Sequence, residues 1–419
     1  MTTATTAAPP KSNRGWTVTL AGTGINLALG VLYTWSVISK GIPDAWGWTE
    51  TEKALPYAVA CLMFSVVMVP AGRMQDRMSP RLVATIGGVL VGLGLMLASR
   101  MTSPLGYIIG FGVLAGSGIG FGYASATPPA VKWFPAAKTG VIAGIVVSGF
   151  GLASVYTAPL ARWAIDQYGL PTTVMGFGVG FLVIVTGLAQ LLAPPPKGYV
   201  PAGTPPANPG TAAPLREDFT PGEVLMTRQF YLLWFMFACG AGAGLMIISK
   251  LATMVEVQAG VTLGFVLVAV LAIGNGGGRI IAGTLSDRIG RQATLVICFV
   301  LQAVCIMLLA LANEQNILGS AAVMALISAL IGANYGANLA IFPSITRDYY
   351  GLKNFGVNYG LVFTSWGLGG FMLALLAGRV YDATQSFNFA YYCSAALLIV
   401  AAAVTLLVKP PQARSASHA

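Results

Sequence analysis

Charged residues are scarce in this sequence. Asp, Glu, Lys and Arg make up 9% of its 419 residues, whereas a soluble globular protein carries about 25%. Hydrophobic residues make up 56% of the chain. A soluble protein could not bury that much apolar surface and still cover its exterior with so little charge. The composition therefore excludes a soluble globular protein and predicts an integral membrane protein, whose first partner is the lipid bilayer.

Residues that build metal sites, disulfides and catalytic centres are scarce as well. The one histidine, His418, lies in the C-terminal tail, and the five cysteines are scattered through apolar segments without metal or disulfide spacing. No nucleophile or acid pair lies inside an apolar run, so we expect no metal, no cofactor and no enzymatic activity. The net charge of +10 does not indicate a nucleic-acid partner, because the basic residues punctuate apolar runs and form no stripe. No obligate protein partner is evident.

Long apolar runs are what the chain has in abundance. Twelve of them have about 18–25 residues, the length that a helix needs to cross a bilayer. They predict an all-α membrane protein with twelve transmembrane helices. Within a few residues, the predicted spans are 16–39, 55–73, 82–100, 105–129, 140–161, 171–193, 230–253, 261–285, 293–312, 317–341, 355–378 and 388–408.

A segment rich in Pro, Gly and Ala separates the sixth run from the seventh, and its composition is typical of a flexible linker. A short amphipathic segment is expected inside it, near 219–226. The chain is thus expected to divide into a disordered tail over 1–15, a six-helix bundle over 16–193, a linker over 194–229, a second six-helix bundle over 230–408 and a tail over 409–419.

Lysines and arginines predict the orientation. Of the 23 basic residues, sixteen lie on the side of the tails and the linker, six lie on the other side, and Arg279 lies inside a run. Lys250 is counted among the six. Because basic residues are enriched on the cytoplasmic side of membrane proteins, both termini are expected in the cytoplasm. The expected location is the plasma membrane, that is, the bacterial inner membrane.

The two halves carry matching motifs. The segment 72–81, GRMQDRMSPR, follows the second run, and the segment 283–291, GTLSDRIGR, follows the eighth run, with a step of 211 residues from Asp76 to Asp287. A second match steps by 216 residues: Gly144, Gly151, Leu152 and Asp166 correspond to Gly360, Gly367, Leu368 and Asp382. Parallel six-span repeats suit an alternating-access carrier.

Arg279 is the charge inside the eighth run. A charge near mid-membrane costs roughly 3 kcal/mol on insertion scales and more in simulations. All thirteen acidic residues fall in loops or at the ends of runs, and none lies at the depth of Arg279. A helix-end carboxylate that reaches inward is one possible partner. The favoured partner is an anion that comes and goes, which means a substrate.

Polar and aromatic residues in mid-span are candidates for the same site. Asn275 lies four residues before Arg279 and therefore on the same helical face, and glycines at 274 and 276–278 let backbone or ligand approach closely. Aromatic residues that could wall a cavity are Tyr33, Tyr123, Tyr335, Phe363 and Trp366. Tyr335, between two asparagines, is the strongest of them. Ordinary helix packing or lipid exposure is the alternative for each.

The paired polar hairpins resemble the signature loop of the major facilitator superfamily, G-x-x-x-D-R-x-G-R. The second copy is complete, whereas the first has Ser79 and Pro80 where Gly and Arg are expected. Charged groups at these helix ends can make contacts that break when a carrier rocks; a tight turn with stop-transfer arginines is the alternative. The candidate gating residues are Asp76, Arg77, Asp287, Arg288 and Arg291.

Within that superfamily the chain is similar to the monocarboxylate and oxalate transporter group, through the segments 41–48 and 132–140 and through Arg279. The resemblance implies that Arg279 binds the substrate carboxylate. Two positions depart from the group: Asn275 stands where proton-coupled animal members have aspartate, and Trp366 stands where oxalate exchangers have lysine.

We therefore expect a carrier of small monocarboxylates such as lactate or pyruvate, working by proton symport. An exchanger of organic anions of the oxalate:formate type is the alternative, and an anion channel with one arginine in its pore is a third possibility. Arg279 is expected to be the one basic side chain at depth, which matches one carboxylate and excludes a dianion.

Overall fold

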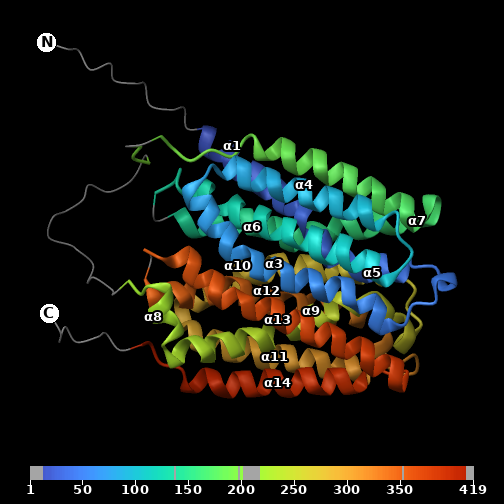
Figure 1. Ribbon diagram of the computed structural model, residues 1–419. Coiled ribbons are helices and arrows are strands. Elements are labelled where there is room, and N and C mark those ends of the chain that lie inside the picture. The colour runs from blue at the N-terminus through green and yellow to red at the C-terminus, as the bar shows by residue number, and fades with distance from the viewer. Residues whose placement is uncertain (1–12, 136–137, 197–198, 202–217, 352, 412–419) are drawn as a thin grey trace, which may run out of the picture.

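The computed structural model describes residues 13–135, 138–196, 199–201, 218–351 and 353–411, and within these ranges it contains helices and no strands. The long helices run side by side along one direction (Figure 1). The first half contains, in chain order, the elements α1 (Asn13–Leu29), η1 (Gly30–Thr34), α2 (Trp35–Lys40), η2 (Asp44–Trp46), α3 (Glu50–Arg77), α4 (Pro80–Ala98), α5 (Pro104–Tyr107), η3 (Ile108–Ala115), α6 (Gly116–Val131) and α7 (Thr139–Ala189).

The second half begins after the linker. Its elements are α8 (Pro221–Leu225), α9 (Arg228–Ala259), α10 (Gly264–Ile289), α11 (Arg291–Leu311), η5 (Ile317–Gly319), α12 (Ala321–Tyr350), α13 (Phe355–Thr384) and α14 (Asn388–Leu407). The short α8 lies in the predicted amphipathic segment. Residues 197–198 and 202–217 of the linker and both chain ends lie outside the described residues.

Eleven helices in the described part are long and apolar enough to cross a membrane. The predicted number was twelve, and the difference lies in α7. Its 51 residues include Gly169, whose φ of 76° and ψ of 163° are not helical, so α7 joins the fifth and sixth predicted spans across a corner. All twelve predicted spans are therefore helical, and the all-α fold is confirmed.

Some helix ends differ from the predicted spans. The tenth was predicted over 317–341, but α12 begins at Ala321 and continues to Tyr350, past Arg347 and Asp348. Residues Ile317–Gly319 form a separate 3-10 turn, which the Asn316 side chain caps by accepting from the Gly319 N–H. The apolar run predicts where the helix crosses lipid, whereas the helix itself continues into the polar interface.

Small residues let helices approach closely, as α10 and α13 illustrate. On α10, Gly274 and Gly278 face the carbonyls of Ala329 and Ala333 on α12, and neither site has room for a Cβ atom. On α13, Gly367 lies against Ser65 of α3 with equally little room. The contact between α3 and α13 joins the two halves, as does a second contact between α7 and α10. We call these the α3–α13 seam and the α7–α10 seam.

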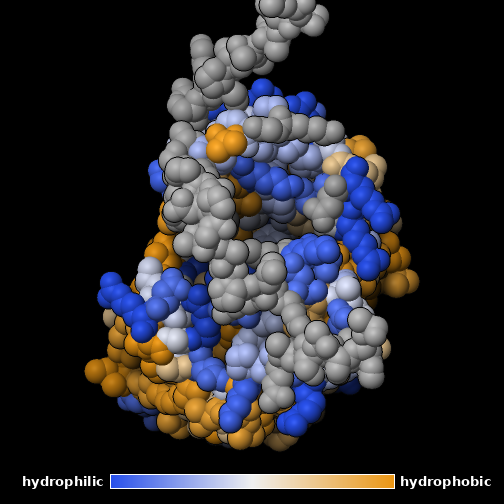
Figure 2. All heavy atoms as spheres, turned by 90° about the vertical axis from the view of Figure 1, so that its left-hand side faces the viewer, coloured by the Kyte–Doolittle hydropathy of each residue, from blue (hydrophilic) through white to orange (hydrophobic). Residues whose placement is uncertain are grey.

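The two faces of the bundle differ. The face where α1 begins and α14 ends, which also carries α8, is called the terminal face; the other is the opposite face (Figure 1). Figure 2 looks onto the terminal face and shows hydrophilic residues around a hollow between the upper, first half and the lower, second half. On the opposite face, ion pairs connect the two halves.

Candidate functional site

Arg279 is buried in α10, with 6% of its surface exposed. Its Nε donates to Oδ1 of Asn275 at 3.2 Å, which confirms that the two side chains share a helical face. Its Nη1 donates to the Val147 carbonyl of α7 at 2.8 Å, so the arginine also ties the two halves together. No ion pair among the described residues includes Arg279.

Two donors at this place have no acceptor. Nη2 of Arg279 and Nδ2 of Asn275 are buried and make no hydrogen bond of acceptable distance and angle among the described residues, although the Tyr123 hydroxyl lies next to the guanidinium. Buried donors are rarely left unpaired, because the unpaired state costs about 1–3 kcal/mol and more for charged groups. An anionic acceptor at this place would satisfy both nitrogens and compensate the positive charge.

Gly151 of α7 leaves room beside the guanidinium. A Cβ atom there would lie 3.3 Å from both Nε and Nη2 of Arg279, which is tighter than ordinary packing. Gly336 of α12 does the same for Asn275, whose carbonyl and side-chain oxygens would meet a Cβ. Two glycines on two helices thus keep bulk away from the polar pair.

Three of the predicted aromatic residues form a hydrogen-bonded chain. The hydroxyls of Tyr33 in η1 and Tyr335 in α12 are 2.5 Å apart, and Nε1 of Trp366 in α13 donates to the Tyr335 hydroxyl at 2.9 Å. The chain crosses from the first half to the second. One of the two tyrosine hydroxyls donates its hydrogen to the other, so the hydrogen of the accepting hydroxyl stays free for a further acceptor.

The remaining predicted aromatics lie next to this chain. Phe363 stacks on Trp366 with ring centroids 5.0 Å apart, and Tyr123 stacks on Phe363 at 6.2 Å. Arg279 lies close enough to the hydroxyls of Tyr33, Tyr123 and Tyr335 to interact with them electrostatically. The structure therefore brings all seven predicted site residues together.

Sequence reasoning missed several neighbours of the site. Phe64 of α3 contacts Trp366 at 5.0 Å, and Phe150 of α7 contacts Tyr33 at 4.9 Å. Tyr57 of α3 is fully buried and lies near Tyr33 and Tyr335, and its hydroxyl lies next to the Cys61 thiol. All three lie in predicted spans, but nothing in the sequence separates an inward-facing aromatic residue from a packed one.

Lys250 corrects one expectation. It is one of the six basic residues expected on the side away from the tails, and Arg279 is expected to be the one basic side chain at depth. Instead Lys250 is 1% exposed inside α9, and its Nζ lies 2.5 Å from Oε2 of Glu50. Because Lys250 has a carboxylate partner, Arg279 remains the uncompensated buried cation of the described residues.

The candidate gating residues lie at the terminal face. Arg291 contacts Asp287 at 2.6 Å and Asp348 at 3.4 Å, and both contacts stay within the second half. Arg77 and Arg288 are exposed and make no ion pair among the described residues. The side chain of Asp76 lies outside the described part.

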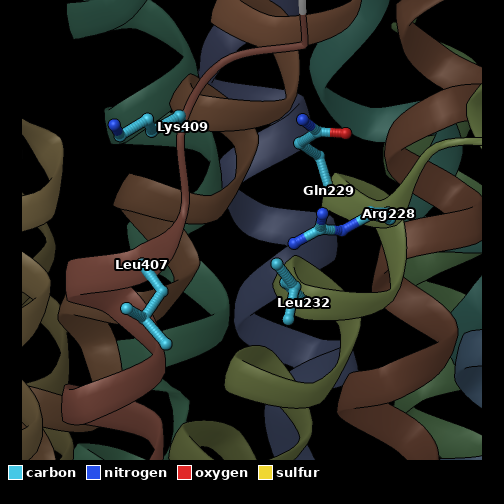
Figure 3. Close-up of a pocket in the computed structure, with 5 residues that line it drawn as sticks. All are labelled: Arg228, Gln229, Leu232, Leu407 and Lys409. Carbon is cyan, nitrogen blue, oxygen red and sulfur yellow. The ribbon is translucent and has the colours of Figure 1, made fainter.

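A recess at the terminal face is separate from this site. Arg228, Gln229 and Leu232 of α9 line it together with Leu407 and Lys409 at the end of α14, and Arg228 extends toward α14 (Figure 3). Its lining comes from two helix ends, whereas Arg279 lies inside α10. Among the described residues no group of His, Cys, Asp and Glu is arranged to hold a metal.

The sequence profile of the Major Facilitator Superfamily matches residues 16–337 and 262–419. The chain belongs to this family of transporters, and it is a multi-pass membrane protein. A solved bacterial homolog of the human lysosomal transporter Spinster, in an inward-facing and occupied conformation, has the same fold, with a TM-score of 0.65 at 14% identity over 96% of this chain and 97% of that one.

The chain is also similar to individual transporters. The uncharacterized MFS-type transporter YhjX of Escherichia coli is 28% identical over 86% of this chain and 87% of its own length. The oxalate:formate antiporter of Oxalobacter formigenes is 27% identical over 84% and 81%. Human monocarboxylate transporter 11 is 26% identical over 57% and 48%.

Proposed function

We propose that this transporter carries small monocarboxylates such as lactate or pyruvate by alternating access, with Arg279 as the carboxylate anchor. The observation that carries the proposal is the pair of unpaired donors, Nη2 of Arg279 and Nδ2 of Asn275, beside a buried charge with no carboxylate partner among the described residues. A guanidinium presents a planar fork that matches a carboxylate. One substrate carboxylate satisfies both donors and neutralises the charge.

The surroundings support a small acid with one charge. Phe64, Phe363 and Trp366 supply an apolar wall, and the free phenolic hydrogen of the Tyr33–Tyr335 pair can meet an oxygen next to the carboxylate. A dianion would bring a second charge without a partner, and desolvating it costs several kcal/mol. One relative is named for monocarboxylate transport and another for exchange of oxalate and formate, so both are named for small carboxylate ligands.

Proton symport is the proposed coupling. Net uptake of an anion against a negative-inside potential needs a co-ion, and each charge is opposed by about 2.3 kcal/mol per 100 mV. Exchange of two anions is the second candidate, because the relative from Oxalobacter is an antiporter and no carboxylate of the described residues pairs with Arg279. In exchange, the leaving anion balances the charge.

Movement in this proposal is a rocking of the halves, 16–193 and 230–408, in the plasma or bacterial inner membrane. The terminal face is cytoplasmic, as the basic residues favour. Asp76, Arg77, Asp287, Arg288 and Arg291 then form cytoplasmic contacts that change as the halves move. No further protein, nucleic acid, cofactor or catalytic step is part of the proposal.

Uptake into proteoliposomes tests it. Labelled lactate and pyruvate are offered with and without an inward proton gradient, and with and without unlabelled acid inside. Accumulation that follows the gradient and stops when the gradient is dissipated supports symport, whereas accumulation that needs an internal anion and ignores the gradient establishes exchange. Uptake of neither acid under any of these conditions would refute the substrate assignment.

A further inference from the structure

A buried ion pair joins the halves near the opposite face. Nζ of Lys250, on α9, donates to Oε2 of Glu50 at 2.5 Å and to the Glu50 carbonyl at 3.0 Å. Glu50 is the first residue of α3, so this contact crosses between the halves. Lys53 also contacts the Glu50 carboxylate, at 3.0 Å. Separating Lys250 from Glu50 would leave a buried charge without its counterion, which is strongly unfavourable.

Asp382 makes a second tie at the same place. Its carboxylate, at the end of α13, accepts from the backbone N–H groups of Glu50 and Thr51, both at 2.8 Å, and from the Thr51 hydroxyl. The first N–H groups of a helix have no partner inside the helix. The second half therefore supplies acceptors for the N-terminus of a helix in the first half.

The cluster of Glu50, Lys250 and Asp382 lies between the candidate site and the opposite face. Tyr57 lies two helical turns beyond Glu50 on α3, next to the Tyr33–Tyr335 pair. Cys61 follows one turn later, fully buried, and faces α13: a Cβ atom on Gly370 would lie 3.4 Å from its Sγ. Opening the α3–α13 seam at Glu50 would therefore admit water past Tyr57 to Cys61.

We propose that Glu50, Lys250 and Asp382 form a latch that holds the opposite face closed, and that substrate access from that face requires this latch to open. The three are positioning residues, since none touches the proposed substrate. Breaking the latch shifts the population toward the state that is open at the opposite face. The inference rests on alternating access and holds for whichever anion is carried.

The native thiol of Cys61 can report the opening. The other four cysteines are replaced by alanine, and a membrane-impermeant maleimide is applied to intact cells and, separately, to inverted vesicles. Glu50→Gln removes the charge that holds Lys250, and we expect Cys61 to be labelled from the opposite face about tenfold faster than in the parent, in proportion to the open population. Asp382→Asn should also accelerate the labelling of Cys61. This variant provides the test if Glu50→Gln does not fold.

The matched control is Glu52→Gln. Glu52 lies in the same helical turn, but it bonds with Thr49 inside the first half, and glutamine preserves that capping box. Its labelling rate should equal that of the parent. A purely structural cluster would lower the Tm of the latch variants without raising the labelling rate, and that result would overturn the latch. Because labelling needs no transported acid, it can succeed even where the substrate assignment fails.

Discussion

The two seams between the halves are related by the internal repeat, yet they are held together differently. At the α3–α13 seam, Asp382 binds the N-terminus of α3 at the opposite face. Its repeat counterpart, Asp166, does not cap α10 but pairs with Arg162 on its own helix at 2.9 Å, and both side chains are 46% exposed. A small recess lined by Lys40, Arg162 and Thr262, among others, lies beside the start of α10.

The α7–α10 seam is instead tied in mid-membrane, by Arg279 to the Val147 carbonyl. A substrate carboxylate would compete for the same guanidinium. The contacts that hold the α3–α13 seam involve protein groups alone. The contact that holds the α7–α10 seam uses a guanidinium for which the proposed substrate would compete. In the proposed mechanism, the repeated scaffold separates gating from ligand binding, because a different residue of each repeat crosses the seam.

The largest effect is expected from removing Arg279, because the α7–α10 seam would lose its proposed substrate anchor. Arg279→Ala should weaken substrate binding at least about 30-fold, since loss of one partner of a buried charged contact costs roughly 2–5 kcal/mol. Arg279→Lys keeps the charge but loses the fork, so it should bind weakly as well. Substrate should raise the Tm of the wild type and leave that of Arg279→Ala unchanged.

The matched control at the same seam is Arg162→Ala, which removes a surface pair. Uptake by that variant should stay close to wild type. Normal uptake by Arg279→Ala would refute the anchor.

The charge at the α7–α10 seam should also set selectivity. Oxalate should compete with labelled lactate or pyruvate at least about tenfold less well than either acid does, because its second charge has no partner. Trp366→Lys should weaken monocarboxylate binding by placing an uncompensated cation near Arg279. If oxalate competes equally well in the wild type, the single uncompensated charge of Arg279 does not determine selectivity for monoanions.

A smaller effect on substrate affinity is expected at Gly151, and its repeat counterpart Gly367 allows the two seams to be compared. Gly151→Ala would put a Cβ 3.3 Å from the guanidinium, and we expect substrate affinity to fall about fivefold with little change in Tm, since the arginine tip can shift. Its repeat counterpart behaves differently: Gly367→Ala would press on Ser65 and should lower the Tm. Gly144→Ala, with open space around its Cβ position, is the control for both.

The smallest effect is expected at Asp166. Exposed ion pairs contribute about 0–1 kcal/mol, so Asp166→Asn should shift the Tm by no more than a few degrees and leave Cys61 labelling unchanged. Asp382→Asn, the equivalent change at the other seam, should accelerate that labelling. If the two variants behave alike in a labelling experiment, the seams are not different in the way described above.

Much of the fold could be predicted from the sequence, because crossing lipid requires runs of apolar residues that are visible without any tertiary information. The corner at Gly169 was not visible, since a single glycine between two runs looks like any short loop. Helix ends such as Tyr350 were also missed, because a helix does not stop where its hydrophobicity stops.

Part of the candidate site could be predicted for a similar reason. A charge such as Arg279 in an apolar run stands out against its background, and so does Asn275 one turn before it. Glu50 and Lys250 did not stand out, because each lies near the end of a span, where charged residues are expected. Only the packing of α13 against both α3 and α9 shows that they meet in a buried place.

The corner at Gly169 has a practical consequence for protein engineering. Epitope tags and cleavage sites tolerate insertion where a loop projects from a helical bundle. The segment 41–49 on the opposite face offers such a loop. At Gly169 the fifth and sixth spans turn without one, and a residue with a side chain would be strained at this positive φ. An inserted tag there would have to unwind a helix first, so this hairpin should be handled as a single rigid piece.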